Sequence, residues 1–373
     1  MRRDTLQSNK NLIGTIFAAL LFFAIAYRFP VKEGEVRVSF MVIMEIALTV
    51  SLSVVIWYYS KPLALFLIMS MVSMFYPVYG PHSFYAQKMV FLGCLWFFLI
   101  VHFVNDVDPI MDALCYGAII NLIVQCFQSI FMTLDLPFWL TSGEPTGLMA
   151  NPNEIAALYI FCLMAFFRKK WFTGIRLAWI PLIVGGIIIS HSKMAIVCLA
   201  FGFMIWLFYQ TMYGKEYNHI RYLMLIFMVI LMGWFILCVP IPSLYLRFKV
   251  WMYTLPILAK HWVIGAGIGH WKVLFKGAMP FDGCRWDMAH NDIYQMWAEM
   301  GVIPLLLLAW YFFDIINRFK KEAILTYIAI GMITINACGN FPFHIAPLAM
   351  IALTWMAILE IQTRGNLCSQ KIL

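Results

Sequence analysis

Long apolar runs separated by short polar segments follow one another along almost the whole chain. About 20 consecutive apolar residues cross the hydrocarbon core of a bilayer as a helix, so such runs are typical of transmembrane helices. Apolar length and polar punctuation predict twelve spans, at residues 11–29, 38–59, 62–79, 88–104, 109–132, 153–167, 175–190, 193–212, 221–239, 292–316, 322–339 and 343–361. The pattern therefore indicates an all-α, polytopic membrane protein.

The composition agrees with this assignment. Of the 373 residues, 63% are hydrophobic and 12% are charged, whereas about a quarter of the residues in soluble domains are charged. The first apolar run, 11–29, lacks a small-residue cleavage site, so we expect a retained helix and not a signal peptide. The sequence contains no internal repeat and no separate soluble segment. We predict one membrane domain over residues 1–373.

The distribution of Lys and Arg predicts the orientation, because these residues accumulate in short cytoplasmic loops. With the N-terminus inside, the basic clusters at 168–176 and 318–321 both fall on the cytoplasmic side. Both termini are then cytoplasmic, and the loop at 240–291 faces outward.

This outward loop is unusually basic. Its acids are Asp282 and Asp287, and its cations are Arg247, Lys249, Lys260, Lys272, Lys276 and Arg285. Long loops cross the membrane regardless of their charge, which is one explanation. The other is a surface on which cationic side chains hold anionic head groups. The composition of the loop fits both.

The first part of the loop has the periodicity of an amphipathic helix. Its apolar stripe consists of Leu244, Phe248, Trp251, Leu255, Leu258 and Trp262. Arg247 lies off this stripe, so the helix would rest at the outer interface with Arg247 at the level of the lipid phosphates. Pro256 should kink the helix or divide it in two. The same stripe is also typical of a helix that packs on the bundle.

A polar cluster, His290-Asn291-Asp292, opens the tenth predicted span. Asn291 or Asp292 can cap the helix, and an imidazole such as that of His290 suits proton transfer near neutrality. Glu299 lies nine residues after His290, about half a turn out of phase, so the two should not pair directly on a regular helix. The depth of Glu299 in the span indicates that its carboxylate has a buried partner or faces a water-filled cavity. A structural role for His290 at the interface fits the same position.

Three shorter motifs are candidates to complete a site. Gly265, Gly267 and Gly269 either bring backbone amides close to an anion or form a tight turn. Lys193 stands in the short turn between two spans, where it meets a head group or extends to the interface. Asn153 opens the sixth span and can cap its helix.

The order of these motifs resembles that of the O-antigen ligase/polymerase superfamily. The motifs are G-x-x-x-N-x-N at 147–153, S-[RK] at 192–193, R-x-x-x-W at 247–251, G-x-G-x-G at 265–269, and His290-Asn291 followed by Glu299 and Gly301. No single motif is specific, and the match rests on five of them in this order over residues 147–361. The resemblance implies a GT-C-type fold. It also implies inverting, metal-independent transfer of a glycan from a polyprenyl diphosphate to an acceptor hydroxyl on the periplasmic face.

The resemblance assigns roles to individual residues. Arg247 matches the loop arginine that contacts the donor diphosphate, and His290 matches the histidine that acts as the base or positions the acceptor. Lys193 stands where the family usually has Arg. Lysine keeps the positive charge but cannot form the two parallel hydrogen bonds that a guanidinium forms with a phosphate. The remaining candidates are Arg285 as a further diphosphate-binding cation, with Glu299 and Asn153 in support.

Location and partners follow from the same resemblance. We expect a multi-pass protein of the bacterial inner membrane with the 240–291 loop in the periplasm. Its partners would be an undecaprenyl-diphosphate-linked glycan, an acceptor such as the lipid A-core, and membrane lipids. We predict no cofactor, no metal and no nucleic-acid partner.

Alternative functions stay open. An O-antigen or capsule polymerase, or a protein O-oligosaccharyltransferase, would belong to the same superfamily. A transporter or flippase also fits twelve spans, with Glu45, Glu299 and Asp314 as intramembrane relays, although the sequence has no symmetric pair of Gly/Pro-broken spans. A non-catalytic membrane subunit would leave the motif order unexplained.

Overall fold

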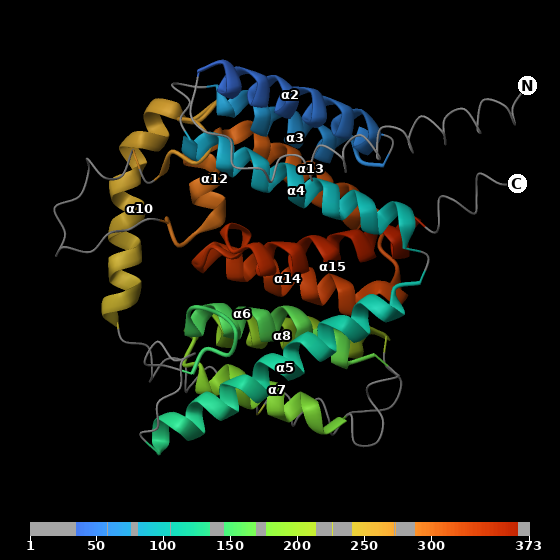
Figure 1. Cartoon of the computed structure of the whole chain (residues 1–373). Helices are drawn as coiled ribbons and strands as arrows, with labels where there is room; N and C mark the ends of the chain where they lie inside the picture. Colours follow the sequence, from blue (N-terminus) through green and yellow to red (C-terminus); the bar gives the residue numbers. More distant parts are fainter. Residues whose placement is uncertain are drawn as a thin grey trace, which may run out of the picture.

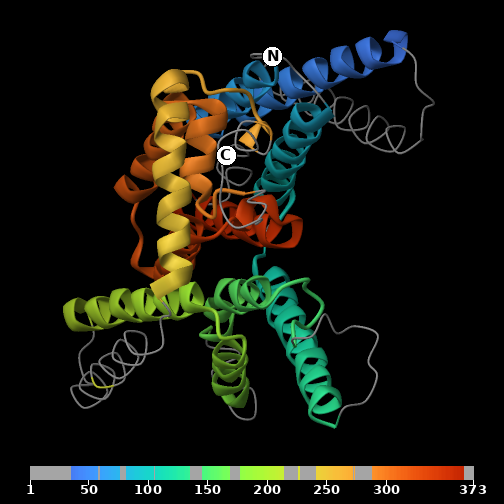
Figure 2. The same ribbon diagram turned by 90° about the vertical axis from the view of Figure 1, so that its left-hand side faces the viewer.

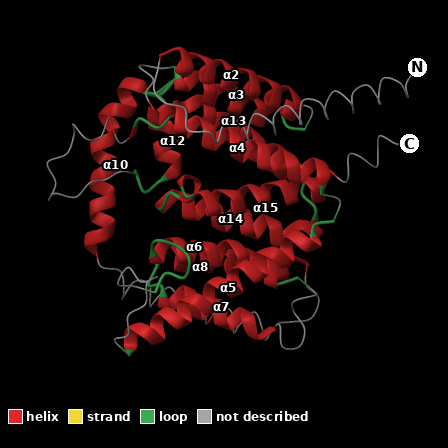
Figure 3. Ribbon diagram, viewed as in Figure 1, coloured by secondary structure: helices red, strands yellow, loops and turns green. Residues whose placement is uncertain are grey.

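The computed structural model describes residues 35–57, 59–75, 81–104, 106–134, 145–168, 177–213, 241–271 and 288–364, with the single positions 226 and 273. All regular structure in these residues is helical, and they contain no strand (Figure 3). The prediction of an all-α chain is therefore confirmed for this part of the sequence.

The helices follow the predicted apolar runs closely. They are α2 (Glu35–Trp57), α3 (Lys61–Met74), α4 (Pro81–Phe103), α5 (Asp108–Thr133), α6 (Pro152–Phe166), α7 (Trp179–Ile189), α8 (Lys193–Tyr213), α10 (Ile241–His261), α12 (Asp292–Met300), α13 (Val302–Asn317), α14 (Ile324–Gly339) and α15 (Ala346–Arg364). Short 3-10 turns, η2 (Lys321–Ala323) and η3 (Pro342–His344), precede α14 and α15. The predicted spans at 11–29 and 221–239 lie outside the described residues, apart from position 226.

Five helical segments are long and apolar enough to cross a membrane, judged by length and composition. They are Tyr85–Phe103, Asp108–Thr133, Lys193–Gln210, Lys321–Gly339 and Ala346–Arg364. Five further apolar helical segments are shorter than 18 residues. The chain is therefore suited to a membrane as a polytopic protein, while the count of twelve spans stays a prediction.

Helices α14 and α15 occupy the centre of the bundle (Figure 1). α15 packs against α4, and α14 packs against α6 and α8. The indole N–H of Trp355 on α15 donates to the carbonyl of Phe161 on α6 at 2.6 Å, and Trp355 is fully buried. A buried indole N–H needs a hydrogen-bond acceptor, and this bond therefore holds α15 against α6.

The tenth predicted span is two helices, not one. Gly301 separates α12 from α13 and adopts φ 80°, in the left-handed region. A β-carbon on Gly301 would lie 2.0 Å from the carbonyl oxygen of Val263. The chain therefore bends where the segment after α10 crosses it, and only glycine fits that contact.

Helix α10 lies across one end of the bundle and runs roughly perpendicular to α14 and α15 (Figures 1 and 2). It continues as one helix through Pro256, so the predicted division does not occur. The predicted stripe is split between two faces. Leu258 is buried together with Val250 and Thr254, which were not in that stripe. The stripe residues Phe248, Leu255 and Trp262 are exposed.

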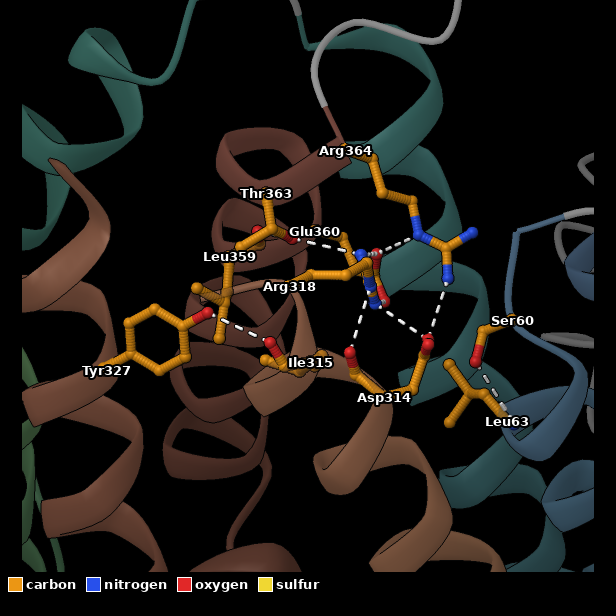
Figure 4. A network of polar contacts seen from close by, with 10 residues as sticks. All are labelled: Ser60, Leu63, Asp314, Ile315, Arg318, Tyr327, Leu359, Glu360, Thr363 and Arg364. Atoms are coloured by element: carbon orange, nitrogen blue, oxygen red, sulfur yellow. Dashed lines mark hydrogen bonds and ion pairs between the residues drawn. The ribbon is translucent and has the colours of Figure 1, made fainter. Parts of the chain in front are cut away.

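The opposite end of the bundle carries an ionic network that joins α13 to α15 (Figure 4). Both oxygens of the buried Glu360 carboxylate accept from Arg318, at 3.0 and 3.2 Å. Asp314 accepts from Arg318 and Arg364, at 3.0 and 3.3 Å. The two acids and two arginines balance in charge, so the network itself carries no net charge. A bidentate arginine–carboxylate contact of this kind is among the stronger polar interactions in proteins.

Loss of the Glu360 charge should destabilise the bundle. In Glu360→Gln, Arg318 loses its buried counter-ion, and we expect about 2 kcal/mol of lost stability, below the 3–5 kcal/mol of a fully buried pair because Arg318 is part-exposed. The measurement is thermal unfolding of the purified protein in detergent. Glu322→Gln, an exposed acid at the same end, is the matched control. Equal unfolding temperatures for the two variants would contradict the role of the network.

Candidate functional site

Segments that are far apart in the sequence meet at the end of the bundle covered by α10. The Ser192 hydroxyl donates to Asn153 Oδ1 at 2.8 Å, which joins the turn before α8 to the start of α6. Arg247 on α10 donates to the carbonyl of Gly339, the last residue of α14. The amide of Gly267 donates to the carbonyl of Glu299 at 2.8 Å. These bonds bring the five motif segments to one end of the fold.

A small pocket lies at this meeting point. His290 and Asn153, two of the predicted site residues, both line it. The remaining lining residues are Asn151, Glu154, Ala157, Asn336, Asn340, Phe341, Pro342, Ile345 and Leu348. The pocket therefore has a polar wall rich in carboxamides and an apolar wall from the segment that joins α14 to α15.

The backbone around His290 is held on both sides. The Trp251 indole donates to the carbonyl of Ala289 at 2.9 Å, and the Ala289 amide donates to Gln295 Oε1 at 3.0 Å. His290 adopts φ 51°, a left-handed conformation that is uncommon for a residue with a side chain. The imidazole ring of His290 contacts the ring of Phe341 edge to face, with the two ring centroids 4.8 Å apart. Strained backbone of this kind is concentrated at functional sites.

His290 is neutral at physiological pH. Burial, followed by the positive charge of Arg247, lowers the pKa of His290 to about 4. A neutral imidazole can accept a proton, so the site presents a base next to a cation.

Arg247 is the cation of this site. It is half-buried, and burial lowers the pKa of its guanidinium, because a charge is less stable away from water. Its hydrogen bond goes to a neutral carbonyl, that of Gly339. Within the described part of the chain, no carboxylate forms an ion pair with Arg247. A partly buried arginine without an acidic neighbour is suited to an anionic ligand.

Glu299 explains the glycine motif. The amide of Gly269 donates to Glu299 Oε2 at 2.9 Å and that of Trp271 to Glu299 Oε1 at 3.0 Å. Gln295 Nε2 also donates to Glu299, at 3.2 Å. The anion that this glycine loop holds is therefore a carboxylate of the protein itself. Glu299 supports the site by fixing the loop after α10, and the loop amides of Gly267, Gly269 and Trp271 are occupied within the fold.

A second polar chain runs behind the pocket. Asp292 Oδ1 lies 2.6 Å from His344 Nδ1, and the amide of Phe343 donates to Asp292 Oδ2 at 2.9 Å. Gln295 Nε2 lies 3.0 Å from His344 Nε2. Burial by itself lowers the pKa of His344, but its bond to Asp292 and the nearby acids raise it above the ordinary value. Asp292 therefore fixes the η3 turn, whereas the cap of α12 is Asn291, whose side chain accepts from Tyr294.

Lys193 and Asn153 are linked through Ser192. Lys193 is the first residue of α8, directly after the buried Ser192 that donates to Asn153. It is half-buried and is not among the residues that line the pocket. Asn151, and not Asn153, caps α6, since its side chain accepts from the Asn153 amide at 2.7 Å. This leaves the Asn153 carboxamide to the pocket and Ser192. Arg285 lies outside the described residues.

Sequence reasoning missed two carboxamides of the pocket. Asn336 lies in the last turn of α14, inside a span recognised only by its apolar character, and Asn340 directly follows that helix. Polar residues within a membrane span are costly and usually functional, and that signal could have identified them. Glu154, in the first turn of α6, lines the pocket as well.

The arrangement combines a neutral imidazole, a cation with no acidic partner among the described residues, and several carboxamides. In the described residues, no group of three His, Cys, Asp or Glu side chains is placed to hold a metal ion. Comparison of the sequence with protein-family models and with curated proteins gives no match. The geometry of the site therefore carries the functional argument.

The close contact at Gly301 provides a test of how the site is held. In Gly301→Ala the new methyl group would collide with Val263, and the backbone conformation at φ 80° and ψ −175° is essentially restricted to glycine, with a cost of about 1–3 kcal/mol for other residues. We expect a lower unfolding temperature in detergent and loss of ligand binding at the pocket. Gly185→Ala is the matched control, because a β-carbon there meets nothing within 4 Å. A Gly301→Ala protein as stable as this control would show that the contact is not needed.

Proposed function

We propose that this protein is a membrane glycosyltransferase. It moves an oligo- or polysaccharide from a polyprenyl diphosphate, such as undecaprenyl diphosphate, to an acceptor hydroxyl at the end of the bundle covered by α10. An O-antigen ligase, with the lipid A-core as acceptor, is the first form of this proposal. The observation that carries it is the pairing of Arg247, a part-buried cation with no carboxylate partner among the described residues, with the neutral His290 at a pocket lined by carboxamides.

The chemistry assigns one step to each of these two residues. His290 accepts the proton of the acceptor hydroxyl while its oxygen attacks the anomeric carbon of the donor sugar. The bond between that carbon and the phosphate oxygen breaks, and the diphosphate leaves with the bonding electrons. Arg247 stabilises the negative charge that develops on the leaving oxygen. Attack from the face opposite the leaving group inverts the anomeric carbon.

The position of α10 supports a substrate that is anchored in lipid. Phe248, Leu255 and Trp262 are exposed on this helix, and apolar side chains of this kind favour a membrane interface. Basic residues Lys249 and Lys260 lie on the same helix. In a periplasmic orientation the helix would lie at the head-group level of the outer leaflet, where the diphosphate of a polyprenyl lipid is found.

A transporter has less support from the site. Glu299 is bound by two backbone amides and Gln295, and Asp314 is paired with Arg318 and Arg364. Both carboxylates are therefore already held by partners within the fold. Glu45 is buried on α2, far in sequence from the pocket-lining segments.

Substitution of the two central residues tests the proposal. We expect Arg247→Ala and His290→Ala each to abolish glycan transfer in vivo and from a purified lipid-linked donor in vitro, without ATP or added metal. Arg247→Lys should retain a small part of the activity, because lysine keeps the positive charge but cannot form the two parallel hydrogen bonds of a guanidinium. Lys320→Ala, which removes an exposed cation at the opposite end of the bundle, is the control and should transfer normally. Near-normal surface glycan in cells that carry either alanine variant, with the variant folded in the membrane, would refute the assignment.

The phenotype of a deletion separates the forms of the proposal. Without a ligase, undecaprenyl-linked polymer accumulates, whereas without a polymerase the acceptor carries single repeat units. A protein O-oligosaccharyltransferase would instead lose glycan from a protein. Analysis of lipid-linked and acceptor-linked glycans from one deletion strain distinguishes the three.

The pH dependence of transfer tests the role of His290. The active form is the neutral imidazole, so activity is lost as the pH falls through its pKa. In the free protein that pKa is about 4, and this value should set the acid limb of kcat/KM for the donor. A bound diphosphate favours the protonated imidazole and raises the pKa, so the acid limb of kcat should lie at higher pH. If the acid limb of kcat lay at a lower pH than the acid limb of kcat/KM, the role of His290 as the base would be contradicted.

A further inference from the structure

The backbone next to His290 is held by a chain of polar contacts that starts at a part-exposed histidine. The Ala289 amide donates to Gln295 Oε1 at 3.0 Å, and Gln295 Nε2 lies 3.0 Å from His344 Nε2. His344 Nδ1 in turn lies 2.6 Å from Asp292 Oδ1. Gln295 and Asp292 are buried, whereas 30% of the His344 side chain is exposed. Water can therefore exchange a proton with His344, at one end of an otherwise buried chain.

Two bonds fix the orientation of the Gln295 carboxamide. Its Oε1 atom accepts from the Ala289 amide, and its Nε2 atom donates to the Glu299 carboxylate at 3.2 Å. An exchange of the two carboxamide atoms would place a donor opposite the amide and an acceptor opposite the carboxylate, so both bonds would be lost. The donor Nε2 therefore faces His344, and the imidazole nitrogen opposite it must accept.

The tautomer of His344 follows from these partners. Because Nε2 accepts from Gln295, the single proton of the neutral ring is on Nδ1, where it donates to Asp292. A second proton, on Nε2, would place two donors 3.0 Å apart. The protonated ring stays in place because its bond to Asp292 becomes charge-assisted. The Gln295 carboxamide is then the group that moves, and its bond to the Ala289 amide is lost.

We propose that His344 and Gln295 are positioning residues for His290, and that they hold it in place only while His344 is neutral. This inference rests on the proposed function, because the base role of His290 is what gives its position a catalytic consequence. It adds to the site a second titrating group, which acts through the Gln295 carboxamide and not on the substrates.

The charged groups that face His344 favour its protonated form. Burial by itself lowers the pKa of His344, but the hydrogen bond to Asp292 and the charges of Asp292 and Glu299, both on α12, raise it above the ordinary value. On α14, Cys338 lies near Asp292. The charged residues of α15, which also packs against the η3 turn, are at the far end of that helix, at Glu360 and Arg364. The acids and the Gln295 carboxamide therefore act on His344 in opposite directions, which makes the ring sensitive to pH.

Nuclear magnetic resonance of the full-length protein in nanodiscs tests the link without relying on catalysis. Histidine labelled with ¹⁵N in the ring reports the protonation of His344, whose signal is assigned by its loss in His344→Gln. Ala289–His290 is the only Ala–His pair in the sequence, so ¹³C-carbonyl alanine with ¹⁵N-amide histidine isolates the His290 amide. We expect neutral His344 to carry its proton on Nδ1, and the His290 amide signal to shift as His344 titrates.

Two variants separate a link through Gln295 from an effect of charge through space. In Gln295→Met, which removes the carboxamide at nearly the same length, His344 should still titrate but the His290 amide should no longer follow. In His344→Gln, the His290 amide should show no transition over that range of pH. This second variant, at a part-exposed position, decides the result if Gln295→Met does not fold. The control is His261→Gln, at the end of α10, which should leave the coupling unchanged.

Transfer kinetics should show the same link as a second step in the pH profile. His290 sets the lower acid limb of kcat/KM, because burial and the charge of Arg247 lower its pKa to about 4. At higher pH, as His344 gains its proton, we expect kcat/KM to fall to a plateau by about 3- to 10-fold, as for the loss of one hydrogen bond. His344→Gln should lack this upper step and keep the lower limb.

The possible outcomes are distinguishable. A His290 amide that does not follow the titration of His344, or that follows it equally in Gln295→Met, overturns the inference, and so does a neutral His344 with its proton on Nε2. If the coupling is present and glycan is transferred without an upper step in kcat/KM, the inference is overturned while the proposed function stands. If the coupling is present but no glycan is transferred at any pH, the positioning of His290 by His344 is upheld and the proposed function fails.

Discussion

The geometry of the site depends on one buried carboxylate. Glu299 is 4% exposed and accepts from two backbone amides of the loop after α10 and from Gln295. A charge at this depth persists only when hydrogen bonds replace its water. Those bonds fix the glycine loop against α12, and Gly265 and Gly301 allow the two backbones to touch. Gln295 in turn holds Ala289, next to His290. The catalytic candidate is therefore positioned through a chain of contacts that begins at Glu299.

The pocket itself is built at a cost in stability. A part-buried arginine with no carboxylate partner among the described residues, a left-handed histidine and a buried amide without a strong partner are each unfavourable. At the other end of the bundle, the charge of the buried Glu360 is neutralised by Arg318 and Arg364. The two ends therefore differ in how their charged groups are paired.

The hydropathy pattern was sufficient to place the helices, because burial in lipid and burial in protein both require apolar residues. It could not place the break at Gly301, since the run of apolar residues continues across it and only a tertiary contact, with Val263, requires the bend. The same ambiguity misplaced the buried face of α10. Phe248 and Val250 are both apolar, and the sequence does not distinguish the side that meets protein from the side left exposed.

The sequence and the structure can be compared at the candidate site. His290 and Asn153 could be named from motif order, and the structure brings them to one pocket. Glu299 was expected to have a buried partner, but no sequence pattern indicated that the partners would be the amides of the glycine loop. Asn336 and Asn340 were overlooked because an apolar average conceals two amides at its end.

The position of α10 has a consequence for how a substrate would reach the site. Helix α10 lies across the ends of the other helices (Figure 2). Phe248, Leu255 and Trp262 are exposed on it, and Arg247 is bonded to the carbonyl of Gly339. In a bilayer, a lipid-anchored molecule could diffuse sideways within its own leaflet and meet Arg247 without leaving the hydrocarbon phase. The approach would be two-dimensional, and the encounter rate would then depend on the surface density of the lipid and not on its concentration in water.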